Sequence, residues 1–316
     1  KQENSKSIKD KILNKSIPKT SKLILNGDDL ISAFLAPENQ RAYFGISRLD
    51  TDVSECVNII NDMPLCPRCG GNLQYDYRRY HHIGHAHCES CGFHSPDCGY
   101  LAEHADQEAM TISVSDGREK REFKLLSDSI FNMYNMVAAI ALLREFGLPY
   151  ESIENGIAKA DIVESRYFEE AVGDVRIVSQ MAKELNAQAC SRAFDYVSGQ
   201  PGDKILILMT YNLLDVKNGS ENICWLYDCD FEFLSRENIK QIIVTGPRAK
   251  DYYLRLLLAG VPAEKISCTL QETDAVFELK PGKAEDIYIL YGIDEIGAAL
   301  EVRKQVAKFM RERNAK

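Results

Sequence analysis

The sequence has 316 residues, of which 45% are hydrophobic and 27% charged. This balance is ordinary for a globular protein with enough apolar material for a core, and the length predicts two domains. The formal net charge of −9 disfavours a general nucleic-acid binder, which would carry a basic excess. No apolar run approaches the roughly 20 residues that cross a membrane, and residues 1–19 contain no signal-peptide core.

The first half of the chain alternates strands, turns and helices in the order typical of an α/β domain. Residues 1–20 predict a solvated, Lys-rich helix or tail. Residues 21–25 predict a short strand that ends in an Asn-Gly-Asp-Asp turn at 26–29, and we expect a helix from this turn to about Leu35. Further strands are expected at 41–46, 111–114 and 122–125, and helices at 132–146 and 151–160.

Between these elements lies an insertion, at about residues 64–98, that is rich in cysteine, glycine, histidine and tyrosine. It contains two C-x-x-C pairs, Cys66 with Cys69 and Cys88 with Cys91, and a glycine follows each pair. Two such turns direct four thiolates at one ion, and the glycine permits a positive φ in each turn. The spacing predicts a closed, structural zinc site in a four-cysteine ribbon. Iron is the alternative metal.

All six histidines lie between His81 and His104. His81, His82, His85 and His87 directly precede the second cysteine pair, which offers a second metal site as an alternative. Four thiolates already satisfy one ion, and no carboxylate sits among these four histidines, so we favour a hairpin with exposed imidazoles. Six further cysteines show no ligand spacing and predict structural or incidental thiols: Cys56, Cys98, Cys190, Cys224, Cys229 and Cys268.

A second domain is predicted from about residue 161 to residue 316. Its short apolar segments are separated by helical ones, which indicates a mainly parallel sheet covered on both faces. The predicted strands are 175–178, 204–209, 239–244 and 286–290, and the predicted helices are 181–197, 248–259 and 293–313.

Several motifs follow one another along almost the whole chain. They are LNGDD at 25–29, YFGI at 43–46, the ribbon from CPRCG at 66–70 to CESCGF at 88–93, NMYNMVAA at 132–139, WLYD at 225–228 followed by Phe231-Glu232, and TGPRAKD at 245–251. In this set the chain resembles the MurT family, the Mur-ligase-like subunit of lipid II isoglutaminyl synthase. The resemblance implies an α/β fold class. It comprises an incomplete Mur-ligase-type central domain over 1–160, which carries the inserted zinc ribbon, and a C-terminal Rossmann-like α/β domain over 161–316.

The resemblance also implies a reaction in peptidoglycan synthesis. The family's ligase subunit uses ATP with Mg²⁺ to activate the α-carboxylate of D-glutamate in the lipid II stem peptide, and ammonia then attacks the acyl phosphate to give D-isoglutamine. A GatD-type class I glutamine amidotransferase subunit supplies the ammonia. The implied setting is the cytoplasm, at the inner face of the cell membrane, with no nucleic-acid partner and no transmembrane segment.

The same resemblance implies roles for individual residues. An asparagine of the helix motif approaches the adenine in Mur-type ligases, so Asn135 is the candidate, with Asn132 beside it; the alternative is a polar pair that caps the helix. Asp28 and Asp29 lie at a strand's carboxyl end, where ligand sites of α/β proteins gather, and the alternative is an Asx turn. Asp228 would reach across an interface and orient the glutaminase histidine, and the alternative is a surface carboxylate.

The segment around Asp228 is expected to be a strand end or a loop. Trp225 and Tyr227 lie just before this carboxylate and predict exposed anchors of an interface, since aromatic side chains are enriched among binding hot spots. We favour Asp228 over Asp230 as the carboxylate that acts on the partner.

The sequence departs from the family pattern in several places. It contains no Gly-rich phosphate loop ending in Gly-Lys-Thr, and we expect that loop upstream of Lys1. The chain alone is therefore expected to be inactive and to bind ATP weakly. The family's Lys-Asn-Pro run appears as Lys183-Glu184-Leu185, its Gly-Arg-x-Glu as SRYF at 165–168, and its Asp-x-Ser-Trp as NICW at 222–225.

These departures leave a second hypothesis open, a non-catalytic or degenerate scaffold subunit that binds and activates a glutaminase-like partner. A third hypothesis, a zinc-ribbon module unrelated to ligation, would need a basic face to bind nucleic acid. Between the first and last cysteines of the ribbon the only basic residues are Arg68, Arg78 and Arg79, which disfavours it.

Overall fold

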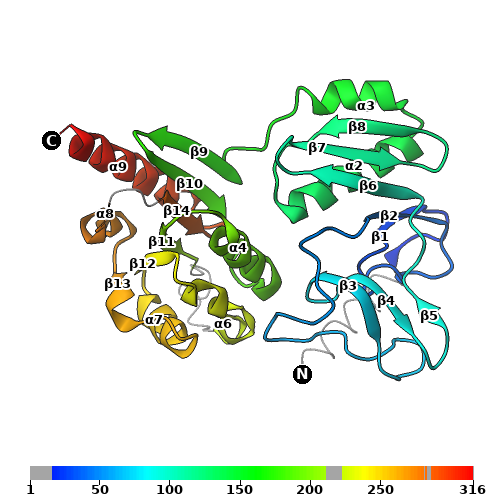
Figure 1. Ribbon diagram of the computed structural model, residues 1–316, viewed down its shortest axis with the longest axis horizontal. Coiled ribbons are helices and arrows are strands. Elements are labelled where there is room, and N and C mark those ends of the chain that lie inside the picture. The colour runs from blue at the N-terminus through cyan, green and yellow to red at the C-terminus, as the bar shows by residue number, and fades with distance from the viewer. Residues whose placement is uncertain (1–15, 211–222, 281, 283–285, 316) are drawn as a thin grey trace. The chain divides into compact units, whose positions relative to one another are not determined.

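The structure of the protein is a computed structural model, and it describes residues 16–210, 223–280, 282 and 286–315. The chain folds as two compact units, residues 1–161 and 162–316, each with a sheet and a core of its own (Figure 1). Most of the helix or tail predicted for residues 1–20 lies outside the described residues.

A five-stranded sheet forms the centre of the first unit. Its order is β1-β2-β6-β7-β8, with β1, β2 and β6 parallel and the remaining pairs antiparallel. Ile112 of β7 and Phe123 of β8 share one core with Met133, Val137 and Ile140 of helix α2, because alternate strand residues and every third or fourth helix residue share a face. The elements are β1 (Leu23–Asn26), β2 (Arg41–Ile46), β6 (Tyr100–Asp106), β7 (Thr111–Ser115), β8 (Lys120–Lys124), α2 (Ile130–Glu145) and α3 (Tyr150–Ile157).

The helix predicted up to Leu35 is wrong, because the residues after β1 fold as turns. The Arg41 guanidinium donates to the carbonyl oxygens of Ala33 at 3.2 Å and Ala36 at 2.6 Å. In a helix, these oxygens would instead accept bonds from later amides of the same segment. Ala36 has a φ of 41° and precedes Pro37, a position that disfavours helix. The turn segment is thus held against β2.

The insertion between β2 and β6 folds as a ribbon around the predicted hairpin, which is confirmed as β3 paired with β4. Leu30, in the segment after β1, belongs to the ribbon's small core. The ring of Phe34 lies 5.2 Å from that of Phe93 in the ribbon. The ribbon is therefore packed on the segment after β1. Its strands are β3 (Gln74–Tyr80), β4 (Ile83–Cys88) and β5 (Phe93–His94), all antiparallel.

The second unit is built on a six-stranded sheet in the order β13-β12-β11-β14-β10-β9 (Figure 1). Every neighbouring pair is parallel except β9 with β10, which confirms the mainly parallel sheet. Its strands are β9 (Tyr167–Val172), β10 (Val175–Met181), β11 (Lys204–Met209), β12 (Ile239–Thr245), β13 (Ile266–Thr269) and β14 (Asp286–Tyr291). Its helices are α4 (Ala187–Gly199), α6 (Cys224–Asp228), α7 (Ala249–Leu258), α8 (Ala275–Glu278) and α9 (Ile296–Asn314), with 3-10 turns η1 (Phe231–Ser235), η2 (Ala263–Lys265) and η3 (Glu272–Asp274).

Helices cover both faces of this sheet, as predicted. On one face Phe194 of α4 and Leu256 of α7 share a core with Leu206 of β11. On the other face Val302 of α9 shares a core with Ile205 of the same strand. Because alternate side chains of a strand point to opposite faces, all residues of β11 are buried, and this explains the continuous apolar run in the sequence.

Within the described residues, four strands were not predicted from the patterns: β5, β6, β9 and β13. β6 and β9 carry acidic residues among their apolar ones, and β13 is short. Helix α4 begins at Ala187 rather than at residue 181, because β10 continues to Met181, which pairs with Tyr291 of β14. Asn186 then caps the helix, since its Oδ1 accepts from the Ala189 amide at 3.0 Å.

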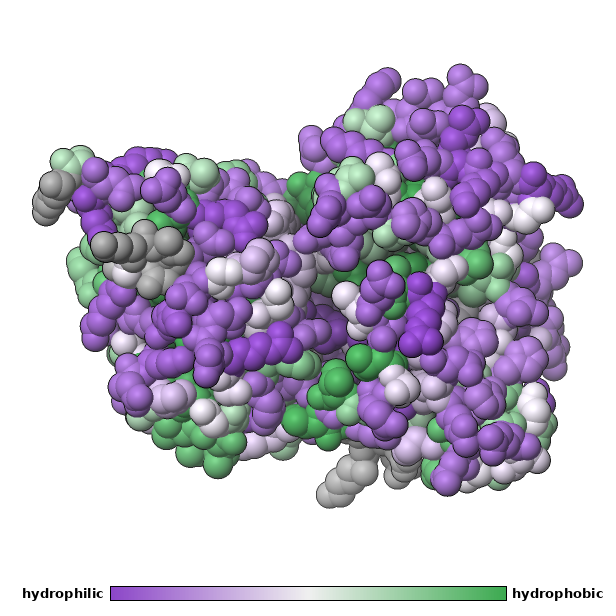
Figure 2. Space-filling model, viewed as in Figure 1, coloured by the Kyte–Doolittle hydropathy of each residue, from purple (hydrophilic) through white to green (hydrophobic). Residues whose placement is uncertain are grey.

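None of the helices within the described residues combines the length and the apolarity needed to cross a membrane. The molecular face shown in Figure 2 is mostly hydrophilic, with apolar residues in small groups between polar ones. Exposed apolar residues of this extent are normal on protein surfaces.

Candidate functional site

Four cysteines of the ribbon meet at one point. The Sγ atoms of Cys66, Cys69, Cys88 and Cys91 all lie within 4.8 Å of one another, with Cys66 3.7 Å from Cys91 and Cys69 3.6 Å from Cys88. Thiolates bound tetrahedrally to zinc at about 2.3 Å are spaced by about 3.8 Å, so this set fits one such ion. Four sulfur donors leave no open coordination position, which makes the site structural. Zinc stays the prediction, and iron its alternative.

Each C-x-x-C pair closes in the same way. The Gly70 amide donates to the Cys66 carbonyl, and the Gly92 amide donates to the Cys88 carbonyl, both at 2.9 Å. The two glycines have φ values of 72° and 66°, and a Cβ on either would meet nothing within 4 Å. Glycine is therefore required at both positions by the positive φ, and not because a side chain would clash, as the sequence predicted.

Freshly reduced protein is expected to contain about one zinc ion per chain, the stoichiometry of a closed four-cysteine site. Cys88→Ser should release the ion and unfold the ribbon, because the Cys88 side chain is buried between the metal and the ribbon core. Cys56→Ser is the control, since that thiol lies outside the cluster. Elemental analysis measures the metal content of each protein, and circular dichroism measures the folding of the ribbon. Zinc retained by Cys88→Ser, or neither zinc nor iron in the parent protein, would contradict the assignment.

Two of the four histidines before the second cysteine pair are buried, which corrects the expectation of exposed imidazoles. His81 and His82 are inaccessible, whereas His85 and His87 are half-exposed. Both half-exposed rings approach Asp76, through Nδ1 at 2.8 and 2.9 Å from its carboxylate. Across the described residues, the four cysteines are the only group of three or more His, Cys, Asp and Glu side chains whose ligand atoms lie close enough for one metal ion, so a histidine metal site gains no support.

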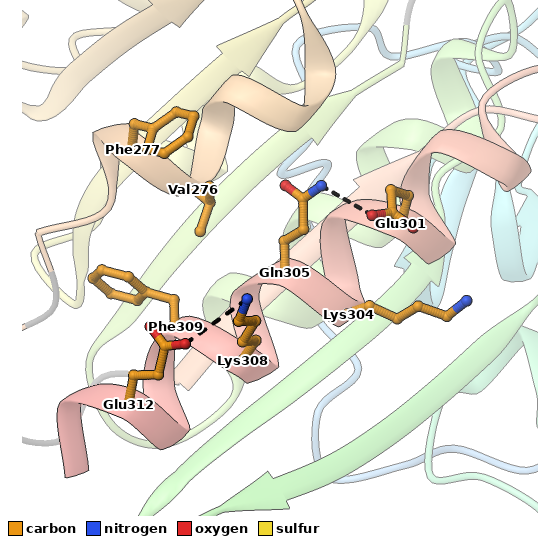
Figure 3. A pocket seen from close by; sticks show the side chains of 8 residues that line it. All are labelled: Val276, Phe277, Glu301, Lys304, Gln305, Lys308, Phe309 and Glu312. Carbon is orange, nitrogen blue, oxygen red and sulfur yellow. Dashed lines mark hydrogen bonds and ion pairs between the residues drawn. The ribbon is translucent and has the colours of Figure 1, made fainter. Parts of the chain in front are cut away.

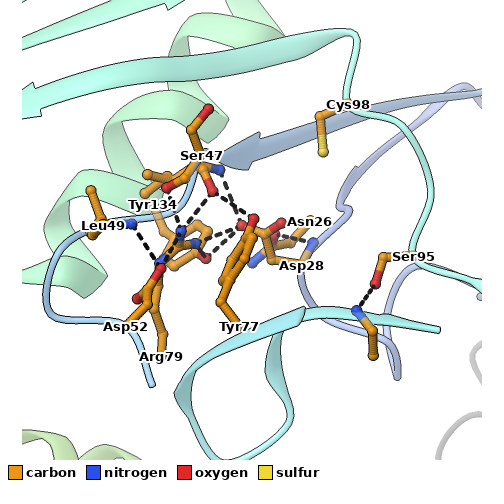
Figure 4. Close-up of polar contacts among 12 residues, drawn as sticks. Asn26, Asp28, Ser47, Leu49, Asp52, Tyr77, Arg79, Ser95, Cys98 and Tyr134 are labelled. Carbon is orange, nitrogen blue, oxygen red and sulfur yellow. Dashed lines mark hydrogen bonds and ion pairs between the residues drawn. The ribbon is translucent and has the colours of Figure 1, made fainter. Parts of the chain in front are cut away.

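Arg79 of β3 joins the ribbon to the turn after β1 (Figure 4). Its buried guanidinium lies 2.8 Å from Asp28 Oδ2 and 3.2 Å from Asp52 Oδ2, and it donates to the Ile46 carbonyl at 2.6 Å. The Tyr134 hydroxyl of α2 donates to the same Oδ2 of Asp28 at 2.6 Å. Burial raises the pKa of Asp52 despite the opposing charge of Arg79. Asp28 is thus held in a buried network, and its role in nucleotide binding stays a prediction.

His82 makes a second link between the ribbon and the turn. Its Nε2 lies 2.9 Å from Asp29 Oδ1 and its Nδ1 lies 2.7 Å from Asp62 Oδ2. Burial lowers the pKa of His82, but the two carboxylates outweigh burial and raise it to about 9. Burial raises the pKa of Asp29, but His82 outweighs it and lowers the pKa to about 2. His82 is therefore a charged imidazolium between the carboxylates of Asp29 and Asp62.

Asp29 also forms the Asx turn that the sequence offered as the alternative to ligand binding. Its Oδ1 accepts from the backbone amides of Ile31 at 2.9 Å and Ser32 at 3.1 Å. The Asn26 side chain acts similarly one turn earlier, because its Oδ1 accepts from the Asp28 amide at 3.0 Å. The geometry of this turn is therefore set both by its own side chains and by the ribbon.

The half-buried thiol of Cys98 explains two glycines of the motifs. A Cβ at Gly27 or Gly45 would lie 2.5 or 2.6 Å from Cys98 Sγ, so neither position has room for a side chain. Burial, with the charge of Asp28 second, raises the pKa of Cys98 to about 12. The neutral thiol fills the space between the turn and β2.

The two asparagines of α2 differ in their surroundings. Asn132 Nδ2 donates to the Ser129 hydroxyl at 2.8 Å just before the helix, but no side chain caps the first turn of α2, so the capping alternative gains no support. Asn135 is exposed, so its amide is accessible to a ligand. Nucleotide binding by either residue stays a prediction.

The segment around Asp228 is the short helix α6, not the strand end or loop that was predicted. Trp225 is half-buried against the core, with its ring 6.3 Å from that of Tyr252, so it is not the exposed anchor expected; Tyr227 is 46% exposed. Asp230 is buried, whereas Asp228 is half-buried at the end of the helix. Asp228 is the better placed of the two to reach another protein, and its catalytic role stays a prediction.

A surface hollow in the second unit lies between α8 and α9 (Figure 3). Phe277 on its edge is 82% exposed, and the charged lining residues are two lysines and two glutamates. The hollow contains none of the predicted site residues. It is lined by Val276, Phe277, Glu301, Lys304, Gln305, Lys308, Phe309 and Glu312.

Comparison with known proteins connects both units to one family. The family model described as MurT ligase C-terminal matches residues 184–292. The MurT subunit of lipid II isoglutaminyl synthase (glutamine-hydrolyzing) from Staphylococcus aureus (strain COL) is 34% identical over 259 residues, which are 81% of this chain and 55% of that protein. This chain belongs to the MurT family. The MurT subunit from Streptococcus pneumoniae (strain ATCC BAA-255 / R6) is 28% identical over 276 residues, 86% of this chain and 59% of that protein. The chain thus spans little more than half the length of the curated relatives it matches.

Solved structures of cell-wall peptide ligases share the fold. A pseudomurein peptide ligase type C from Methanothermus fervidus gives a TM-score of 0.68 at 19% identity, covering 95% of this chain and 59% of that one. A MurF ligase from Thermotoga maritima in complex with ADP gives 0.55 at 13% identity, covering 99% and 59%. These likenesses concern the fold, and they confirm the predicted Mur-ligase-type α/β architecture.

Proposed function

We propose that this chain belongs to a ligase subunit that amidates the D-glutamate α-carboxylate of lipid II to D-isoglutamine, in an ATP-dependent reaction of peptidoglycan synthesis. The observation that carries the proposal is the 34% identity, over 81% of the chain, to a relative named as the MurT subunit of lipid II isoglutaminyl synthase. The reaction takes place in the cytoplasm, at the inner face of the cell membrane.

In this proposal, ATP with Mg²⁺ and the zinc ion have different roles. ATP with Mg²⁺ supplies the activation of the carboxylate, and the exposed amide of Asn135 contacts the adenine. The zinc ion is structural. It holds the ribbon, and the ribbon in turn fixes Asp28 and Asp29 through Arg79 and His82. Asn135 is the residue proposed for the adenine end of the nucleotide, and no step of phosphate chemistry is assigned to the described residues.

A GatD-type glutaminase is the partner in this proposal, and it releases ammonia from glutamine for the ligase. The half-buried carboxylate of Asp228 ends α6, beside the exposed ring of Tyr227. A carboxylate there can bond to the far nitrogen of the partner's catalytic histidine and hold its tautomer, as the third member of a triad does.

Asp228→Asn is expected to leave folding and the complex intact and to cut glutamine hydrolysis by roughly 10²-fold or more, the scale of loss when an orienting carboxylate is removed. The experiment is co-expression of this chain with the glutaminase, followed by an assay of glutamate release. Asp174→Asn is the matched control, because Asp174 is an exposed aspartate of the same unit at the turn between β9 and β10. Full glutaminase activity of the Asp228→Asn complex would show that this carboxylate does not orient the histidine.

The scaffold hypothesis is distinguished by a second readout. It is favoured by Glu184 and Leu185, which stand where the family carries Asn-Pro. A scaffold would support glutamine hydrolysis without any ATP-dependent amidation of lipid II by the complex. A ligase subunit shows both, and it couples ADP release to D-isoglutamine formation.

A further inference from the structure

Glu295 is a buried carboxylate that has no side-chain partner of opposite charge within the described structure. It precedes helix α9 and is 1% exposed, and neither of its side-chain oxygens accepts a well-formed hydrogen bond from a described residue; the nearby backbone amides of Gly292 and Glu295 lower its pKa less than burial raises it. Other carboxylates of this unit face arginine: Asp286 lies 3.0 Å from Arg176, and Glu232 lies 2.8 Å from Arg255. A buried carboxylate is unfavourable unless it is paired or neutralised, so Glu295 requires either a proton or a cation.

Glu184 brings a second carboxylate to the same place. A Cβ built on Gly292 would lie 2.2 Å from Glu184 Oε2 and 2.3 Å from Glu295 Oε2, so the two oxygens converge on the space beside this glycine. Glu184 Oε2 is held there because it accepts from the Ile293 amide at 2.8 Å. Within the described part of the chain, neither glutamate forms an ion pair with a basic side chain.

The pair lies where parallel sheets bind ligands. Glu184 follows β10 and Glu295 follows β14, and these strands are parallel neighbours, so both carboxylates lie beyond the carboxyl ends of the strands. Burial first, then the charges of Glu184 and Asp294, raise the pKa of Glu295 to about 8. Without a cation, the pair therefore holds a proton at neutral pH, and a bound cation would displace it.

We propose that Glu184 and Glu295 bind a divalent cation of the Mg²⁺ or Mn²⁺ kind. Each carboxylate supplies one oxygen and water completes the coordination, which is the usual arrangement for Mg²⁺. Oxygen donors suit such hard ions, whereas the four cysteines suit zinc, so the two sites take different metals. The proposed cation site does not depend on the ligase activity.

Electron paramagnetic resonance of Mn²⁺ tests the site, in zinc-replete full chain at pH 8 and without nucleotide. The wild type is expected to bind about one Mn²⁺, which Mg²⁺ displaces. Glu295→Gln and Glu184→Gln should each weaken binding by roughly ten-fold or more, as loss of a metal-site residue does. Glu237→Gln, which changes an exposed glutamate of the same unit, should leave binding unchanged.

Thermal unfolding separates a cation site from a pair that only shares a proton. Without cation, Glu295→Gln should melt at a higher temperature than the wild type at pH 8, because a neutral amide replaces a buried carboxylate. Mn²⁺ should raise the melting temperature of the wild type but not of this variant. Glu184→Gln provides the same comparison at a half-buried position, should Glu295→Gln fold poorly. Absence of Mn²⁺ binding by the wild type, or equal binding by both variants and the control, would overturn the proposal.

Discussion

Arg79→Met is expected to lower the free energy of unfolding of the first unit by about 3–5 kcal/mol, the cost of removing one partner from a buried ion pair. The side chains of Arg79, Asp28 and Asp52 are 2%, 4% and 1% exposed, so water cannot replace the lost cation. The variant also loses the contact with the Ile46 carbonyl that fixes the ribbon to β2. Chemical denaturation combined with hydrogen exchange of β2 and β3 measures the loss and locates it.

Two further variants sharpen this test. Arg118→Met removes an exposed arginine of the same unit and should change stability by no more than about 0.5 kcal/mol. Arg79→Lys keeps the charge but loses the planar fork of donors, so its stability should fall between those of the wild type and Arg79→Met. If Arg79→Met costs less than about 1 kcal/mol, the network does not hold the ribbon in place.

The first unit should lose about 3 kcal/mol of stability as the pH rises from 6.5 to 9, at about 1.4 kcal/mol for each unit of pKa shift. The pKa of His82 is raised from 6.5 to about 9 in the folded protein. Between these values the unfolded chain has lost the proton that the folded chain keeps, so the stabilisation is complete below pH 6.5 and disappears through pH 9. Asp29 acts at the other end, because its pKa is lowered from 3.8 to about 2. Its contribution is complete above pH 3.8 and is lost toward pH 2.

His82→Gln should remove most of this pH dependence, because an amide cannot carry the charge that Asp29 and Asp62 stabilise. The measurement is the difference in unfolding free energy between wild type and variant at each pH, which cancels groups elsewhere such as Glu295. His85→Gln is the control, since His85 contacts Asp76 on the outer side of the hairpin and not the turn. An equal difference at pH 6.5 and pH 9 would contradict the charged state assigned to His82.

Features that depend on neighbours in the sequence could be predicted without the structure. The cysteine ribbon follows from two C-x-x-C pairs with their glycines, because each pair sets its own turn geometry. Strands β2 and β11 were predicted at their observed bounds, since short apolar runs flanked by turns carry their own signal. The helices α2 and α7 were predicted within about two residues at each end, the usual uncertainty of helix boundaries.

Features that depend on distant residues could not be predicted in this way. The helix expected after β1 is replaced by turns because Arg41, from the next strand, binds the carbonyl oxygens of Ala33 and Ala36. The exposed position expected for Trp225 was wrong because Tyr252, on a later helix, covers it. No local pattern contains the position of either partner.

The same distinction, between features set by neighbouring residues and features set by distant ones, holds for the candidate sites. By itself the sequence predicted the cluster of four cysteines and the resemblance to the MurT family, because both depend on short motifs of fixed spacing. Only the tertiary structure decided that Arg79 and His82 bury their charges against Asp28 and Asp29, more than fifty positions away along the chain. It likewise brought Glu184 beside Glu295, from the ends of two parallel strands. Buried charges need partners, and which partner is within reach depends on how the strands are ordered in the sheet.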